Sequence, residues 1–215
     1  MKKLIVLICF VLFIIGCNNS QGLKYANRDY QEELKEMPSY LVNHFPKKIV
    51  SLPIKSEITI DTTSQCIYYM LFEYNKNEAL SLQKKFEKKH LAKFQSSDPN
   101  LILIKMESIR YWLKEKTIYD KVIIDNKMYF PIPFFEKSEY SKSGDVVKTE
   151  DVYSDYTKCG LSKNFIIYVL DSKPGHYWKG LSPLYYMPFG WKNGYSKGIC
   201  INEEKGIIIY WGIIW

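Results

Sequence analysis

The residues whose types and spacing best suit chemistry lie in the segment 175–198, GHYWKGLSPLYYMPFGWKNGYSKG. Its glycines and prolines predict a structured loop rather than a helix. Aromatic rings on such a loop offer flat stacking faces for a sugar or a peptide, and Tyr, Trp and His add polar edges. The candidate ligand-binding side chains are His176, Trp178, Tyr185, Tyr186, Trp191 and Tyr195. The alternative is that these rings cover the core, because large aromatic side chains are usually mostly buried.

The histidines and cysteines show no recognisable catalytic or metal-binding pattern. His44, His90 and His176 do not form H-E-x-x-H, and the chain contains no C-x-x-C. The sequence therefore predicts no metal site and no cofactor. A nucleophilic pair of His176 with Cys159 or Cys200 needs only closeness in space, but no local signature supports it.

Six carboxylates share a polar segment, 136–164, that is poor in aliphatic residues: Glu136, Glu139, Asp145, Glu150, Asp151 and Asp155. Their spacing does not match a calcium-binding EF-hand loop, and a solvated loop is the simplest interpretation. A hydrolase that uses two carboxylates stays open as an alternative, because such pairs are assembled from distant positions.

The elements that must position these residues are mainly β-strands. Apolar runs at 165–170, 197–201 and 207–215 are separated by short polar turns that contain glycine, which is typical of hairpins. The run 65–74 is apolar on both faces and predicts a central strand, and we expect Ile207–Trp215 to be interior as well. The fold class is therefore α+β: a largely antiparallel sheet in a single domain, with two or three amphipathic helices packed on it.

Two segments have helical periodicity. One begins near Asp29, continues to Phe45 and should be interrupted at Pro38. The other is capped by Asn75 and carries one apolar stripe: Ala79, Leu82, Phe86, His90 and Phe94. A further hairpin is expected over 121–132, turning at 125–127.

Composition argues against a nucleic-acid partner. The net charge is +7, but the basic residues are lysines apart from Arg28 and Arg110. Base readout and bidentate phosphate contacts favour arginine, and these lysines are spread along the chain. An apolar content of 47% argues for a folded domain rather than disorder.

The N-terminus has the parts of an export signal. Lys2 and Lys3 precede an apolar run, Leu4–Ile15, which is too short for a transmembrane helix of about 20 residues. An ordinary secretory signal would end in an A-x-A-like site, and none is present. The run ends in Ile14-Ile15-Gly16-Cys17, which resembles the lipobox of bacterial lipoproteins.

The resemblance implies cleavage before Cys17 after a diacylglycerol is attached to its thiol. The expected organisation is a signal peptide at 1–16, a lipidated cysteine with a flexible tether at 17–28, and a globular domain at 29–215. Asn18, rather than an aspartate, resembles the sorting signal of lipoproteins that face the periplasm from the outer membrane.

The sequence therefore predicts a lipid-anchored cell-envelope protein with a non-catalytic binding or scaffolding role. Its expected partners are the membrane, through the anchor, and a glycan or an envelope protein. One alternative is a glycan- or peptide-binding accessory lipoprotein that uses the aromatic segment 175–198. The second alternative is an envelope hydrolase.

Overall fold

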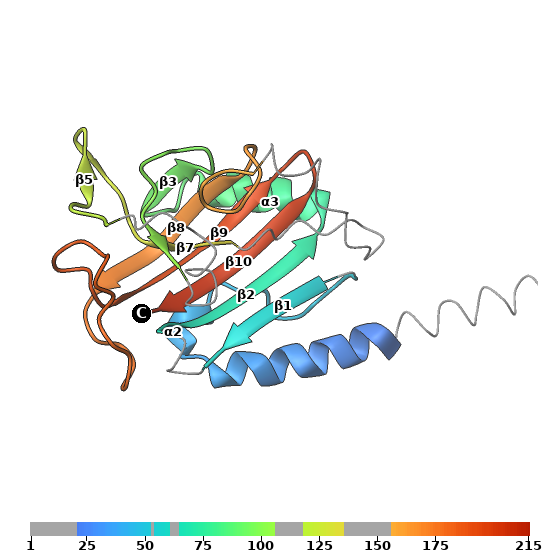
Figure 1. Ribbon diagram of the computed structural model, residues 1–215. Helices are drawn as coiled ribbons and strands as arrows, with labels where there is room; N and C mark the ends of the chain where they lie inside the picture. Colours follow the sequence, from blue (N-terminus) through green and yellow to red (C-terminus); the bar gives the residue numbers. More distant parts are fainter. Residues whose placement is uncertain (1–20, 53, 61–64, 106–117, 136–155) are drawn as a thin grey trace, which may run out of the picture.

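The computed structural model describes residues 21–52, 54–60, 65–105, 118–135 and 156–215. Figure 1 shows these segments arranged around one twisted sheet. The predicted single α+β domain with a largely antiparallel sheet is confirmed.

The main sheet has six strands in the order β1-β2-β10-β9-β8-β3, and every neighbouring pair is antiparallel. The strands are β1 Ile54–Thr59, β2 Ile67–Tyr74, β3 Ala92–Gln95, β8 Ile166–Pro174, β9 Gly194–Asn202 and β10 Ile207–Ile214. The hairpin formed by β9 and β10 therefore fills the middle of the sheet, between β2 and β8.

Strand β10 is interior, as its apolar residues predict. It pairs with β2 on one side and β9 on the other, and all eight of its residues are buried. The turn before it ends at Gly206, whose φ is 67°. A Cβ at this position would lie 2.9 Å from the backbone nitrogen of Lys76, so both the backbone conformation and the space require glycine.

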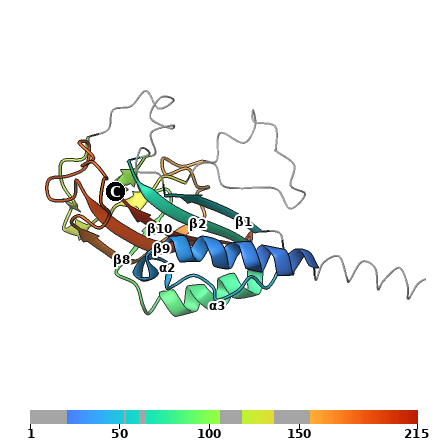
Figure 2. The ribbon, with the colours of Figure 1, turned by 90° about the horizontal axis from the view of Figure 1, so that it is seen from below.

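Side chains of the sheet alternate between two covered faces. On the face that we call the helix face, Tyr69 and Tyr210 pack under the helices, which all lie on one side of the sheet in Figure 2. On the opposite face, which we call the loop face, Met70 and Trp211 pack under irregular segments of the chain. Cover on both faces explains why the central strands are apolar throughout.

The N-terminal helix differs from the prediction. Residues 21–36 are helical, so residues 21–28 do not form the flexible tether expected from their polar composition. Leu23, Asn27, Tyr30 and Leu34 recur at helical spacing toward the sheet, where Leu23 and Leu34 pack against the core and Tyr30 is buried. The predicted interruption at Pro38 is confirmed, because a separate short helix, α2 Ser39–Val42, follows it.

Helix α3, Lys76–Phe86, begins as predicted and ends early. The Asn75 side chain accepts a hydrogen bond from the Glu78 amide at 3.1 Å, which caps the helix. The predicted continuation through His90 to Phe94 is wrong, because Phe94 lies in strand β3, opposite Ile167 of β8. The apolar stripe fitted a longer helix, but pairing with β8 buries Phe94 on the loop face.

Strand β8 is longer than predicted. The polar residues after Leu170 indicated a turn, yet the strand continues to Pro174 after an irregularity between Val169 and Asp171. Asp171 then lies opposite Lys197 of β9. This extension carries the β8–β9 ladder to the aromatic segment.

Two small sheets complete the described residues. Strands β4, Leu103–Ile104, and β7, Ile132–Pro133, pair in parallel. Strands β5, Ile123–Ile124, and β6, Lys127–Met128, form the predicted hairpin, with φ of 49° and 61° at its two turn residues. The carboxylate-rich part of the predicted loop, 136–155, lies outside the described residues.

Candidate functional site

The aromatic segment connects the two longest strands of the sheet at one end of the molecule. Its last five predicted residues form the start of β9, so we define the aromatic loop as residues 175–193. Its base is closed by a hydrogen bond from the Gly175 amide to the Asn193 carbonyl at 3.0 Å. A second, from the Leu184 amide to the Lys192 carbonyl at 2.8 Å, ties its middle, so the loop has a defined backbone.

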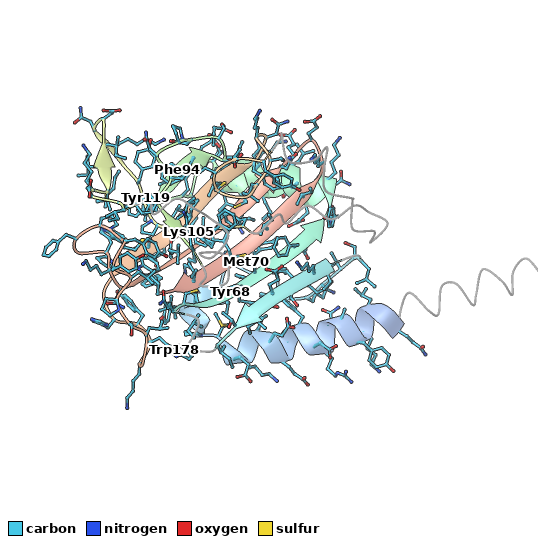
Figure 3. All side chains as sticks on the ribbon, viewed as in Figure 1. Tyr68, Met70, Phe94, Lys105, Tyr119 and Trp178 are labelled. Atoms are coloured by element: carbon cyan, nitrogen blue, oxygen red, sulfur yellow. The ribbon has the colours of Figure 1, made fainter. Side chains whose placement is uncertain are left out.

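Part of the loop covers the loop face of the sheet. Trp191 is 7% exposed and stacks on Trp215, with ring centroids 6.4 Å apart and planes within 14°. Tyr186 is buried, and its hydroxyl accepts a hydrogen bond from the Lys105 amide at 3.0 Å. The Tyr186 carbonyl also accepts a hydrogen bond from the Tyr119 amide at 2.8 Å (Lys105 and Tyr119 are labelled in Figure 3). These two candidate residues are therefore occupied in packing.

Two other candidates belong to the opposite face. Tyr195 is buried on the helix face, and its hydroxyl donates to Asp171 at 2.7 Å. Its ring makes edge-to-face contacts with the rings of Tyr177 and Tyr40, and the ring centroids are 4.6 Å and 5.2 Å apart, respectively. Trp178, labelled in Figure 3, is half-buried against the same core. The structure thus places Tyr186 and Trp191 on the loop face and Tyr195 and Trp178 on the helix face, instead of gathering the six candidate residues on one face.

The tip of the loop is the turn 188–191, which is closed by a hydrogen bond from the Trp191 amide to the Pro188 carbonyl at 2.9 Å. Phe189 is 95% exposed, Tyr185 is 58% exposed, and His176 is exposed as well. A shallow, open hollow of about 340 Å³ is lined by Gly175, His176, Phe189, Gly190, Lys192 and Asn193. The sequence did not single out Phe189 as a site residue. Its position between Pro188 and Gly190, a pair typical of a tight turn, is the signal that predicts a projecting tip.

The buried side chain of Lys197 links strand β9 to helix α2 on the helix face. The Lys197 ammonium donates to the Tyr40 carbonyl at 2.6 Å and to the Asn43 side chain at 2.9 Å. Burial lowers the pKa of Lys197, while the Asp171 carboxylate works in the opposite direction. These contacts satisfy carbonyl and amide groups at the end of helix α2, which is a structural task.

The cysteines are poor nucleophiles in this fold. Cys66, Cys159 and Cys200 are buried free thiols, and burial raises the pKa of each. A nucleophilic cysteine needs the reverse, a lowered pKa and access to substrate. His176, the proposed partner of Cys159 or Cys200, lies in the exposed hollow, so the geometry does not favour the Cys–His hypothesis.

The other histidines are engaged with backbone carbonyls. The Nε2 atom of His44 lies 2.9 Å from the carbonyl oxygen of Gly198 in the central strands. Burial lowers the pKa of His44 to about 3, so this imidazole is neutral at physiological pH. The Nδ1 atom of His90 lies 2.7 Å from the Phe86 carbonyl oxygen at the end of α3.

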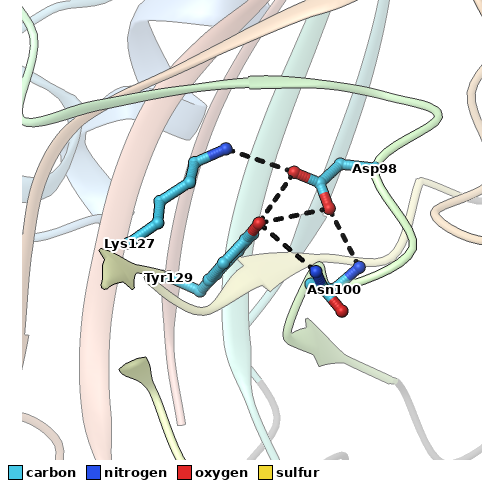
Figure 4. Close-up of polar contacts among 4 residues, drawn as sticks. All are labelled: Asp98, Asn100, Lys127 and Tyr129. Atoms are coloured by element: carbon cyan, nitrogen blue, oxygen red, sulfur yellow. Dashed lines mark hydrogen bonds and ion pairs between the residues drawn. The ribbon is translucent and has the colours of Figure 1, made fainter. Parts of the chain in front are cut away.

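A second polar cluster joins the β5–β6 hairpin to the segment after β3 (Figure 4). Asp98 accepts hydrogen bonds from the Asn100 amide at 3.0 Å and the Tyr129 hydroxyl at 3.1 Å, and it pairs with Lys127 at 3.2 Å. The Lys127 ammonium also lies 4.8 Å from the ring centre of Phe94 and 4.9 Å from that of Tyr129. These groups satisfy one another, so the cluster acts as a clasp within the fold.

Among the described residues, no group of three or more His, Cys, Asp or Glu side chains is arranged to hold a metal ion. Within the same residues, no helix has the length and apolar character required to cross a bilayer.

Comparison of the chain with protein-family models, with curated proteins and with solved structures finds no match. The function must therefore be argued from the chain itself.

Proposed function

We propose that this chain is a lipid-anchored cell-envelope protein with a non-catalytic binding role, and that the tip of the aromatic loop contacts its partner. The observation that carries the proposal is Phe189, a large apolar ring that is 95% exposed. It stands on a loop whose backbone is tied at its base and middle, and the following residue, Gly190, has a φ of 85°. The ring is thus presented by a defined turn.

An exposed ring of this kind is a suitable anchor for a partner. Aromatic side chains that enter a pocket of the partner often supply most of the binding energy of an interface. The loop adds two further exposed rings, Tyr177 and Tyr185, together with the exposed cation Lys192. An apolar anchor with a polar surround is the composition expected of a protein-binding patch.

The position of the loop fits an anchored protein. In Figures 1 and 2 the aromatic loop lies at the end of the molecule opposite residue 21, where the described helix begins. Residue 21 is only four residues from Cys17, the proposed lipidation site. The loop would therefore face away from the membrane surface, toward the periplasm if the protein is sorted to the outer membrane.

An envelope protein fits the exposed tip better than a glycan does. Sugar sites commonly use Trp and Tyr faces with nearby polar groups, but Trp191 is buried and Trp178 is half-buried. The hollow beside Phe189, with His176 and Lys192, supports a glycan or a peptide as the second candidate.

Photo-crosslinking in living cells tests the proposal. A photoreactive phenylalanine analogue at position 189 should yield a specific protein adduct, and the same analogue at Ile123, an exposed site on another hairpin, should not. Co-sedimentation with purified peptidoglycan tests the glycan candidate, with Phe189→Ala as the comparison. Binding at the loop is excluded if position 189 gives no adduct of its own and Phe189→Ala leaves co-sedimentation unchanged.

The anchor has its own test. Cys17→Ala should abolish labelling of the protein by a fatty acid and its recovery with membranes. A variant that still labels and still sediments with membranes contradicts the lipoprotein interpretation.

A further inference from the structure

A second unusual surface lies at the other end of the molecule, beside the start of the described helix. Val50 is 58% exposed and Leu52 is 46% exposed. Lys24 and Lys48 are exposed and line a hollow with Val50, and Lys47, the neighbour of Lys48 in the chain, is exposed as well. This shallow hollow of about 450 Å³ is lined by Leu23, Lys24, Asn27, Lys48, Ile49 and Val50. Aliphatic side chains and lysines thus share one patch, which we call the proximal face.

The proximal face is held by specific bonds between the helix and the segment 46–52. Asn27 and Ile49 exchange two hydrogen bonds, from the Asn27 side-chain nitrogen to the Ile49 carbonyl at 2.8 Å and from the Ile49 amide to the Asn27 side-chain oxygen at 2.7 Å. The Tyr30 hydroxyl donates to the Pro46 carbonyl at 2.6 Å, and the Gln31 side chain to the Lys47 carbonyl at 2.9 Å. The segment therefore runs back along the helix toward its N-terminal end.

This pairing decides which side chains are exposed. Ile49 is buried under the helix while the next residue, Val50, is exposed. Leu52 reaches the first described turn, where a Cβ on Gly22 would lie 3.6 Å from its Cδ1 atom. Side chains of the helix thus bind the backbone of residues 46–49, and this fixes the course of the chain that carries Val50 on the outside.

Chain length places this face close to the membrane if the protein is lipidated. Residue 21 is four positions after Cys17, and four residues span at most about 14 Å. The polar headgroup layer of a bilayer is about 6 Å thick on each side. The first turns of the helix, with Leu23 and Lys24, must therefore lie at or near the lipid surface.

We infer that the proximal face docks on the surface of an anionic phospholipid bilayer, as a second contact that adds to the lipid at Cys17. The inference rests on the proposed lipid anchor. Val50 and Leu52 insert at the level of the headgroups, and Lys24, Lys47 and Lys48 bind lipid phosphates. Long lysine side chains suit this geometry, because their apolar stems follow the aliphatic surface while their charges reach the headgroups. Docking would fix the orientation of the domain relative to the bilayer.

Fluorescence quenching in vesicles tests the inference with the full, lipidated chain. The three other cysteines of the mature chain are buried, so a single label can be placed at Val50→Cys, with Ile123→Cys as the control. The vesicles contain phosphatidylcholine with or without phosphatidylglycerol, and a quencher is carried on lipid headgroups. Flotation of the vesicles, measured in parallel, reports the anchor alone.

The label at position 50 should be quenched much more strongly than the label at position 123, and only when phosphatidylglycerol is present. Each lysine near an anionic surface changes the ratio of docked to undocked protein about fivefold, so replacing Lys24, Lys47 and Lys48 by Glu should remove most of the quenching. The same variant should still float with the vesicles.

Equal quenching at positions 50 and 123 in protein that floats overturns the docking and leaves the anchor intact. Quenching that survives the charge reversal overturns the role of anionic lipid. A position-50 signal that depends on protein concentration instead of lipid composition assigns the face to a second copy of the chain and also overturns the inference. Wild-type protein that does not float overturns the lipid anchor, and the docking with it.

Discussion

The replacement Glu73→Gln should change how the stability of the fold depends on pH. Glu73 lies on β2 under the helices and is only 7% exposed. It accepts a hydrogen bond from Tyr210, and Glu78 at the start of α3 adds a second negative charge. Burial, reinforced by the charge of Glu78, raises the pKa of Glu73 from 4.5 to about 7.

The sign follows from proton linkage. Between about pH 4.5 and pH 7 the folded protein keeps a proton on Glu73 that the unfolded chain has lost, so stability falls as the pH rises. The stabilisation of the folded state by protonated Glu73 is fully present below about pH 4.5 and is lost once the pH rises above about 7. Each pH unit in this interval costs about 1.4 kcal/mol, which makes the full loss about 3 kcal/mol. The neighbouring hydroxyls of Tyr30 and Tyr210 stay protonated throughout, because burial raises the pKa of both.

A glutamine has no charge to desolvate and keeps an oxygen that can accept the bond from Tyr210. Glu73→Gln should therefore match the wild type at about pH 4.5 and exceed its free energy of unfolding by about 1–3 kcal/mol at about pH 8. Urea unfolding followed by tryptophan fluorescence across this range gives the comparison. Glu32→Gln, an exposed carboxyl of the N-terminal helix, is the matched control and should keep the wild-type pH dependence.

The reasoning fails if the free energies of unfolding of the wild type and Glu73→Gln change in parallel with pH. Parallel curves would mean that Glu73 ionises in the folded state as readily as in the unfolded chain. A variant that is less stable than the wild type at every pH would show that the carboxylate contributes more through its contacts than it costs through burial.

Four further substitutions test the packing and the polar cluster around Asp98. Gly198→Ala should lower the free energy of unfolding in urea by about 1–3 kcal/mol, because the added Cβ would lie 2.5 Å from the ring of Trp211. A loss below about 0.5 kcal/mol would contradict this close approach. Trp191→Ala should cost about 3–5 kcal/mol and Trp178→Ala clearly less, since only the first is buried; equal losses in urea unfolding would reverse that assignment. Lys127→Met should lower stability by about 0.5–1 kcal/mol through loss of the cation–π contacts, and an unchanged melting temperature would show that the clasp is dispensable.

The central strands could be predicted from the sequence because their constraint is local. Apart from Gly212, residues 207–214 are large and apolar on both faces, a pattern typical of a strand covered on both sides. The turn at Gly206 and the cap at Asn75 were readable for the same reason, since each depends on a residue type that suits one backbone conformation or one hydrogen bond.

The errors come from contacts between residues far apart in the chain. The helix over 21–28 depends on Asn27 and Ile49, which are 22 residues apart, so the polar sequence alone indicated a tether. Phe94 fitted a helical stripe, but its pairing partner in β8 lies more than 70 residues later. In the segment 175–198 the sequence offered six candidate rings without a rule for which of them would pack on a face of the sheet and which would stay exposed. Trp191 and Tyr195 are four residues apart and pack on opposite faces.

The N-terminal helix connects the two proposed contacts, that of Phe189 with a partner and that of the proximal face with the bilayer. Its described length of 16 residues corresponds to about 24 Å, which is long enough to reach along much of a small domain. Near its far end Glu33 accepts hydrogen bonds from Tyr69 at 2.7 Å and Ser56 at 3.1 Å, so the helix is bonded to both β2 and β1.

A helix bonded in this way cannot rotate independently of the sheet. If its first turns rest on lipid, the sheet takes a fixed angle to the membrane, and Phe189 at the opposite end takes a fixed height above it. A flexible tether would have let the loop approach a partner from any direction. The helix restricts that approach, so a partner bound by Phe189 would be held at a defined distance from the bilayer.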